Sequence, residues 1–391
     1  RLGLAYRITN GMVMRLGYGI TYNGSAYAGI AGLMSNQPPF SIAEKWTYAP
    51  VADLANSLLP ITLRNGFATP IGASNTYGID PNYRLGYAQQ WDFSVQQEVR
   101  PLKLQVLMDY TGTKGTHLDL VETPNLAPTG ALRIANVQDF RWETFGADSI
   151  LHSGLVRVNR RLTNGISFGV TYQFSKSIDD ASTLSGGGGG GIPIQNLFNR
   201  RADRGLSTID QPHRLNVQYN YELPFGTNKH FFSEPSLYKA ALGDWQLNGT
   251  WVYNSGTPLT VSAPSSCYTN LTGVTNGTLR ANATGLSTGI SDKSVAEWFN
   301  TSAFTCPAAG QYGNAGKDTL RNPGVISMAA TLNKTFVFAD GRSLNVRIQA
   351  NNPLNMVQYN RFNTTLNSPT FGRVTNTAQM RTAQIVARFN F

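Results

Sequence analysis

Short segments in which apolar and polar residues alternate recur along most of the chain. Between Arg214 and Tyr221 every second residue is apolar or aromatic, and Asn216, Gln218 and Asn220 lie between them. A period of two residues is the period of a β-strand, in which successive side chains point to opposite faces. Each such segment is therefore predicted to be a strand with one apolar and one polar face.

The same pattern predicts eleven strands, and helical periodicity is nearly absent from the chain. The predicted ranges are 1–8, 12–23, 85–100, 104–113, 149–162, 166–178, 213–225, 244–254, 326–338, 343–352 and 381–391. The predicted fold class is all-β, with antiparallel strands that follow one another up and down.

The connections between these strands alternate strictly between short and long. The short ones lie at 9–11, 101–103, 163–165, 226–243 and 339–342, and the long ones lie near 24–84, 114–148, 179–212, 255–325 and 353–380. Transmembrane β-barrels have short periplasmic turns and long extracellular loops, whereas Greek-key sandwiches have no reason to alternate in this way. We therefore predict a transmembrane antiparallel up-and-down β-barrel with long extracellular loops.

The polar faces of these strands are expected to line the lumen of the barrel. The lumen-facing candidates are Asn216, Gln218, Asn220, Gln246, Asn248, Arg347 and Gln349. Together with the loops near 24–84, 179–212 and 255–325, these side chains would select a ligand.

The last predicted strand ends on an aromatic residue. Its apolar face carries Ile385, Ala387, Phe389 and Phe391. Because the alternation of connections fixes the direction of every strand, this strand is expected to run towards the periplasm.

Composition agrees with a folded chain of this class. Only 14% of the residues are charged, and the chain contains 39 Gly, 19 Phe and 17 Tyr, whereas disordered chains carry high charge and few aromatic residues. No run of 18 apolar residues occurs, so strands would have to cross a membrane. The formal net charge is +10, but the basic residues are dispersed, so nucleic acid is not expected as a partner.

The two cysteines, Cys267 and Cys306, fall in one loop-like region. This placement favours a disulfide formed in an oxidising compartment, and two unrelated free thiols are the alternative.

Arg200, Arg201, Asp203 and Arg204 form the densest cluster of charge in the chain. The cluster would either present arginines to an anionic ligand or form ion pairs that pin a long loop to the barrel wall. We favour the structural role.

Catalysis is not expected. The four histidines lack the spacing of a metal site, and no cofactor is indicated. The segment Gly285–Gly289 matches the Gly-x-Ser-x-Gly pattern, but it lies in a polar loop without the strand and helix that a nucleophile elbow requires. An enzyme hosted in the lumen or at the rim is the alternative.

Eight phrases follow one another in order along the chain. They are Gln90–Gln96, Tyr110–Leu118, Tyr172–Asp180, Arg201–Gly205, Tyr221–Gly226, Trp298–Asn300, Tyr312–Gly316 and Asn367–Arg373. In this order they resemble the C-terminal half of the barrel of a TonB-dependent receptor. The resemblance is to the large Oar-like type, whose N-terminus carries a carboxypeptidase-regulatory-like domain.

The resemblance implies a plugged barrel of about 22 strands in the bacterial outer membrane, which imports a scarce solute with energy from the TonB complex. We expect residues 1–391 to be the C-terminal portion of such a barrel, with the plug domain and signal peptide not present. Phe389 and Phe391 would be the signal read by the barrel-assembly machinery. The implied partners are outer-membrane lipid, that machinery, the TonB complex through the plug, and an unidentified small ligand.

Two other functions fit the same pattern. A structural barrel could display its long loops to a partner, and a passive porin could conduct through an open lumen. A plug domain and a TonB box upstream would favour transport, whereas their absence would favour display.

Overall fold

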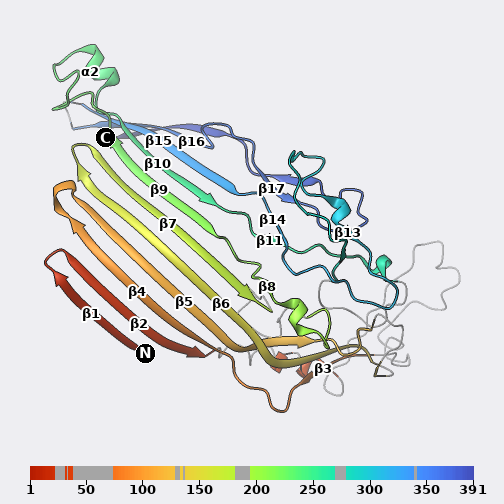
Figure 1. Cartoon of the computed structure of the whole chain (residues 1–391). Coiled ribbons are helices and arrows are strands. Elements are labelled where there is room, and N and C mark those ends of the chain that lie inside the picture. Colours follow the sequence, from red (N-terminus) through yellow and green to blue (C-terminus); the bar gives the residue numbers. More distant parts are fainter. Residues whose placement is uncertain are drawn as a thin grey trace, which may run out of the picture.

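The computed structural model describes residues 1–22, 31–32, 34–37, 74–127, 133–134, 137–180, 194–268, 279–338 and 341–391. Its main feature is one curved antiparallel sheet (Figure 1). The principal strands are β1 (Leu2–Thr9), β2 (Met12–Tyr22), β4 (Tyr87–Val99), β5 (Leu104–Glu122), β6 (Val137–Thr163), β7 (Ile166–Asp179), β9 (His213–Glu222), β10 (Gln246–Asn254), β15 (Val325–Val337), β16 (Ser343–Asn351) and β19 (Thr382–Asn390).

These eleven strands lie in the sheet in the same order as in the chain, and all ten neighbouring pairs are antiparallel. The prediction of an all-β, up-and-down fold is therefore confirmed. The short turns gather at one end of the sheet and the long connections at the other (Figure 1). We refer to these as the turn end and the loop end.

Two strands are much longer than the alternating pattern predicted. β5 has 19 residues and β6 has 27, although a tilted strand crosses a bilayer with about 9–11 residues. The additional residues of β5 and β6 pair with each other at the loop end, between Leu118–Glu122 and Trp142–Ala147. The sequence predicted a loop in place of these extensions. Their residues no longer alternate between a lipid-facing side and a polar side, so the pattern of a strand is not visible there.

The register gives the sheet one apolar and one polar face. Cross-strand partners share a face, and Leu332 pairs with both Leu247 and Ile348, which in turn pairs with Ile385. Large side chains on this apolar face, such as Met108 and Ile385, are exposed. Among the described residues, the buried apolar side chains of the sheet lie at its loop end, such as Leu120 of β5 and Ala147 of β6.

The main hydrophobic core lies among the connections at the loop end instead. Short elements order these connections: β3 (Ser74–Ile79), β8 (Gly205–Leu206), β11 (Pro258–Leu259), β12 (Asn282–Ala283), β13 (Phe304–Thr305), β14 (Leu320–Arg321), β17 (Tyr359–Phe362), β18 (Val374–Thr377), and the 3-10 turns η3 (Arg200–Asp203), η4 (Ser265–Cys267) and η5 (Thr301–Ala303). β3 pairs with β6 in parallel. None of these short elements was predicted from the sequence.

Helix is scarce in the described part of the chain. The turn end carries the 3-10 turn η2 (Arg100–Leu102) and the helix α2 (Leu237–Leu242), which lies between β9 and β10. None of the described helices is long and apolar enough to cross a membrane.

β1 and β19 form the two edges of the sheet. Within the described ranges, β1 pairs with β2 alone and β19 pairs with β16 alone. Each edge therefore presents a row of backbone groups that can pair with another strand.

Candidate functional site

A continuous polar surface crosses the sheet from β9 to β19. We call the polar-face side chains of β9, β10, β15, β16 and β19 the polar wall. One row of cross-strand partners consists of Asn220, Asn248, Thr331, Gln349 and Gln384. The next row towards the turn end consists of Glu222, Gln246, Asn333, Arg347 and Val386. All seven lumen-facing candidates lie on this one face.

The chemistry of the polar wall is dominated by carboxamides. Each Asn or Gln offers two N–H donors and a carbonyl acceptor, so a row of them can bind neutral polar groups of either kind. Gln384 Nε2 donates to Gln349 Oε1 at 2.5 Å, and Asn351 Nδ2 donates to Thr382 Oγ1 at 3.3 Å. These bonds orient amides that would otherwise rotate freely.

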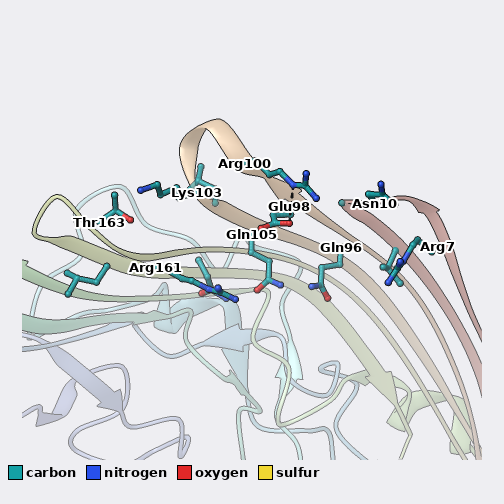
Figure 2. Close-up of a pocket in the computed structure, with 14 residues that line it drawn as sticks. Arg7, Asn10, Gln96, Glu98, Arg100, Lys103, Gln105, Arg161 and Thr163 are labelled. Atoms are coloured by element: carbon teal, nitrogen blue, oxygen red, sulfur yellow. Dashed lines mark ion pairs between the residues drawn. The ribbon is translucent and has the colours of Figure 1, made fainter.

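A second polar feature is a pocket at the turn end of the same face, with a volume of 560 Å³. Figure 2 shows Arg7, Gln96, Gln105 and Arg161 projecting into it from four strands of the sheet. Arg100 and Lys103 add two further cations, and the one acidic side chain among the lining residues is Glu98, whose carboxylate lies 3.6 Å from Arg100 Nε. The pocket therefore favours anionic groups. Sequence reasoning missed it because its residues come from separate hairpins.

We call the described residues of the connections at the loop end the loop layer. Its core combines three connections, represented by Leu126 after β5, Val261 and Phe299 between β10 and β15, and Phe362 after β16. Val261 is completely buried and Phe299 is 3% exposed. Hydrophobic packing therefore stabilises the loop layer in addition to the hydrogen bonds of its backbone.

A disulfide joins Cys267 to Cys306 within this core, with their Cα atoms 5.2 Å apart. Asn367 Nδ2 donates to Cys306 Sγ at 3.3 Å, which ties the connection after β16 to the same point.

Three ion pairs hold the loop layer together and attach it to the sheet. Arg280 Nη1 donates to Asp203 Oδ1 at 2.6 Å, and Lys317 Nζ lies 2.5 Å from Asp179 at the end of β7. The third pair joins Arg321 to Asp210. Their acidic members are all buried. The pairs therefore fix how the loop layer sits over the end of the sheet.

The residues of the predicted charge cluster have different surroundings. Asp203 pairs with Arg280, in another loop, rather than with the arginines beside it, whereas Arg201 and Arg204 are exposed. Arg200 lies against the backbone of Gly146 in β6. Burial raises the pKa of the Asp203 carboxyl above its ordinary value, and the Arg280 guanidinium offsets only part of this effect.

A buried carboxyl lies where β3 meets the extension of β6. Tyr77 Oη donates to Glu143 Oε2 at 3.1 Å, and both side chains are buried. Glu143 is twenty residues from Thr163, at the turn end of β6, and therefore lies beyond the membrane-spanning part of that strand. Burial raises the pKa of Glu143 to about 7; the bond from Tyr77 opposes this shift and the nearby Asp119 adds to it.

Two kinds of site receive no support from the geometry. The described residues contain no group of three or more His, Cys, Asp or Glu side chains that could hold a metal ion. Ser287 of the Gly-x-Ser-x-Gly match lies in an irregular exposed segment, where its Oγ accepts from the backbone N–H of Gly289 at 3.3 Å.

Most of the predicted ligand-selecting loop near 24–84 lies outside the described residues.

The sequence also matches a family model. The description of that family is outer membrane beta barrel domain, and the match covers residues 1–384. The chain belongs to the outer membrane β-barrel domain family. No curated protein sequence matches it.

Several solved structures of outer-membrane transporters are similar to this chain at low sequence identity. The outer membrane transporter YddB from Escherichia coli is 9% identical, with a TM-score of 0.50, over 97% of this chain and 39% of that one. The ferripyoverdine receptor of Pseudomonas aeruginosa is 9% identical, with a TM-score of 0.47, over 100% of this chain and 32% of that one. The ferric-catecholate import receptor Fiu of E. coli K12 is 10% identical, with a TM-score of 0.44, over 98% of this chain and 34% of that one. The chain thus spans about a third of the length of these proteins.

Membership of the outer membrane β-barrel family places the chain in the bacterial outer membrane and assigns an environment to each face. The apolar face of a β-barrel domain meets lipid, and its polar face meets the lumen. Short turns lie on the periplasmic side and long loops outside the cell. The polar wall is therefore expected to face the lumen, with the loop layer at its extracellular end. The cationic pocket lies on the same face of the sheet, at the turn end of β1, β4, β5 and β6, and is expected on the periplasmic side.

Proposed function

We propose that this chain forms part of the wall and the outer loop layer of a TonB-dependent receptor that imports a small polar ligand. The observation that carries the proposal is a polar row of four carboxamides and one hydroxyl, which lies on the proposed lumenal face below a loop layer fixed to the sheet. Its members are Asn220, Asn248, Thr331, Gln349 and Gln384. A ligand admitted by the loops would meet this row on its way to the cationic pocket.

The rest of the barrel would come from further strands of the same protein. The unpaired edges of β1 and β19 cannot stay exposed in lipid, because their backbone N–H and C=O groups would lack partners. We propose that residues 1–391 form the C-terminal portion of an Oar-like receptor, a proposal supported by the family resemblance. The plug domain would connect it to the TonB complex, and the barrel-assembly machinery would insert it.

The loop layer favours one alternative function. Its hydrophobic core and disulfide give it the stability of an independent docking surface, as a barrel that displays loops to a partner would require. Import and display differ in whether lumenal side chains contact the ligand.

A binding experiment on the full-length protein separates the two functions. Thermal-shift screening in detergent against iron chelates, cobalamin, oligosaccharides and short peptides would supply a probe, and calorimetry would give its Kd. Import predicts that the double substitution N220A and N248A weakens binding about tenfold or more, because each lost amide leaves a polar group of the ligand unpaired. Val217→Ala on the lipid face of β9 is the matched control. Unchanged binding in the amide variant would contradict import through this wall.

A further inference from the structure

The connection between β9 and β10 carries exposed apolar side chains that belong neither to the polar wall nor to the loop layer. We call residues 223–245 the α2 segment. It lies at the turn end of the sheet, on the same side as the C-terminus (Figure 1). It is the longest of the turn-end connections and contains the helix α2.

The α2 segment is attached to the lipid-facing side of the barrel through Lys334. This residue pairs with Val346 and alternates with Leu332 and Phe336, so it belongs to the apolar face. Its Nζ donates to the carbonyl of Ala240 at 2.6 Å and lies 4.6 Å from the centre of the Phe336 ring. A lysine on this face would otherwise be an unpaired charge in lipid, so α2 supplies the acceptors it needs.

A second bond fixes the same helix end. Trp245 Nε1 donates to the carbonyl of Ala241 at 2.9 Å, and the centre of the Trp245 ring lies 6.0 Å from Lys334 Nζ. Both contacts use the last carbonyls of α2, which have no partner within the helix. The helix is therefore held in a defined orientation against the outer surface of β10 and β15.

One side of α2 is apolar and exposed. Leu237, Tyr238 and Leu242 fall within one arc of the helix and are 88%, 68% and 51% exposed. Phe231 and Phe232, just before the helix, are also exposed, and the Phe232 ring stacks on Tyr238 with 6.1 Å between centroids. Lys239 points elsewhere and donates to the carbonyl of Ser233 at 2.9 Å.

We propose that the α2 segment inserts this apolar arc into the periplasmic leaflet of the outer membrane. The occupant is phospholipid, because the segment is held on the face that already meets lipid and continues that face at its periplasmic margin. Amphipathic helices of this kind lie with their apolar side about 5–10 Å below the headgroups, and aromatic rings gather at the same depth. The segment thus anchors the periplasmic end of the β9–β10 hairpin.

Depth-dependent fluorescence quenching tests the insertion without any ligand, so its result does not depend on the proposed import. The full-length protein would carry a single NBD label on L237C or Y238C in phosphatidylethanolamine and phosphatidylglycerol liposomes that contain doxyl-labelled phosphatidylcholine. The native cysteines form the Cys267–Cys306 disulfide and would not take the label. W251C on the apolar face serves as the lipid control, and L286C, an exposed leucine of the loop layer, serves as the water control.

Insertion predicts quenching at 237 and 238 that is closer to the value at 251 than to the value at 286. Quenching closer to the value at 286 would overturn the proposal. Only protein that shows the heat-modifiable mobility of a folded barrel on SDS gels would be compared, and the two label positions guard against a local effect of either substitution.

Discussion

The Arg280 guanidinium donates to the Asp203 carboxylate at 2.6 Å, although the two residues lie 77 positions apart in different connections. Both side chains are almost fully buried. The main-chain N–H of Arg280 also donates to Gln195 Oε1 at 2.6 Å, so this residue is fixed to the 180–212 connection by two bonds. The loop layer consequently behaves as one folded unit rather than as separate loops.

Removing Asp203 should destabilise the loop layer strongly. Asp203→Ala leaves the Arg280 guanidinium buried without its counter-ion, and the loss of one partner of a buried ion pair typically costs about 3–5 kcal/mol. Trypsin cleavage of the loops, followed as a function of urea, should occur at clearly lower urea in this variant. Arg201→Ala removes an exposed charge from the same cluster and should leave the urea concentration at which half of the loops are cleaved unchanged. If half of the loops are cleaved at the same urea concentration in both variants, the ion pair between Asp203 and Arg280 does not stabilise the loop layer.

Reduction of the disulfide should loosen the same unit. The bond closes a loop with a sequence separation of 39, for which the chain-entropy model gives about 4 kcal/mol. Replacing both Cys267 and Cys306 by Ser should make the loop layer more sensitive to protease while the barrel keeps its heat-modifiable mobility. Equal protease resistance in the reduced and oxidised proteins would contradict this role.

Glu143 should make the attachment of β3 depend on pH. Burial raises its pKa from 4.5 to about 7, so between these values the folded state binds a proton that the open state releases. The contribution to stability is fully present below pH 4.5 and is lost as the pH rises through 7, and its full size is about 3 kcal/mol. Hydrogen exchange of the β3 amides, corrected for intrinsic rates, should show protection falling over this interval. Glu143→Gln should show no such fall, and a fall of equal size in that variant would assign the effect to another group.

The C-terminal aromatics should act in assembly rather than in ligand binding. Phe391 is fully exposed, and its ring centroid lies 6.4 Å from that of Phe389. Phe391→Ser should therefore lower the amount of protein in the outer membrane more than it changes the ligand affinity of the protein that does assemble. Quantitative immunoblots of outer-membrane fractions provide the measurement, and normal levels of the variant would count against the role.

The alternation of side chains predicted the sheet well because each strand lies between two fixed environments. Asn216, Gln218 and Asn220 could be assigned to one face from their period alone, and the hairpin turn at Asn164–Gly165 was visible because both residues adopt positive φ angles, of 52° and 79°. These features depend only on neighbours in the chain.

The parts that sequence reasoning missed depend on contacts between distant segments. Nothing near Asp203 indicates that its partner is Arg280, and the residues of the cationic pocket come from strands as far apart in the sequence as those of Arg7 and Arg161. The helix α2 has six residues, too few for a helical period to stand out, although Ser236 caps it by accepting a bond from the Lys239 N–H at 3.1 Å. The parallel pairing of β3 with β6 likewise depends on a tertiary contact at Glu143.

A spin-label scan along β9 tests directly whether this sheet has one face in lipid and one in the lumen. Nitroxides placed singly at 215 to 220 in the full-length protein in liposomes would be compared for collision with oxygen, which concentrates in lipid, and with a polar nickel chelate, which concentrates in water. We expect oxygen access at 215, 217 and 219 and nickel access at 216, 218 and 220, because these two sets of positions lie on opposite faces of the strand. Equal access of both reagents at all six positions would contradict a strand with one face in lipid and one in the lumen.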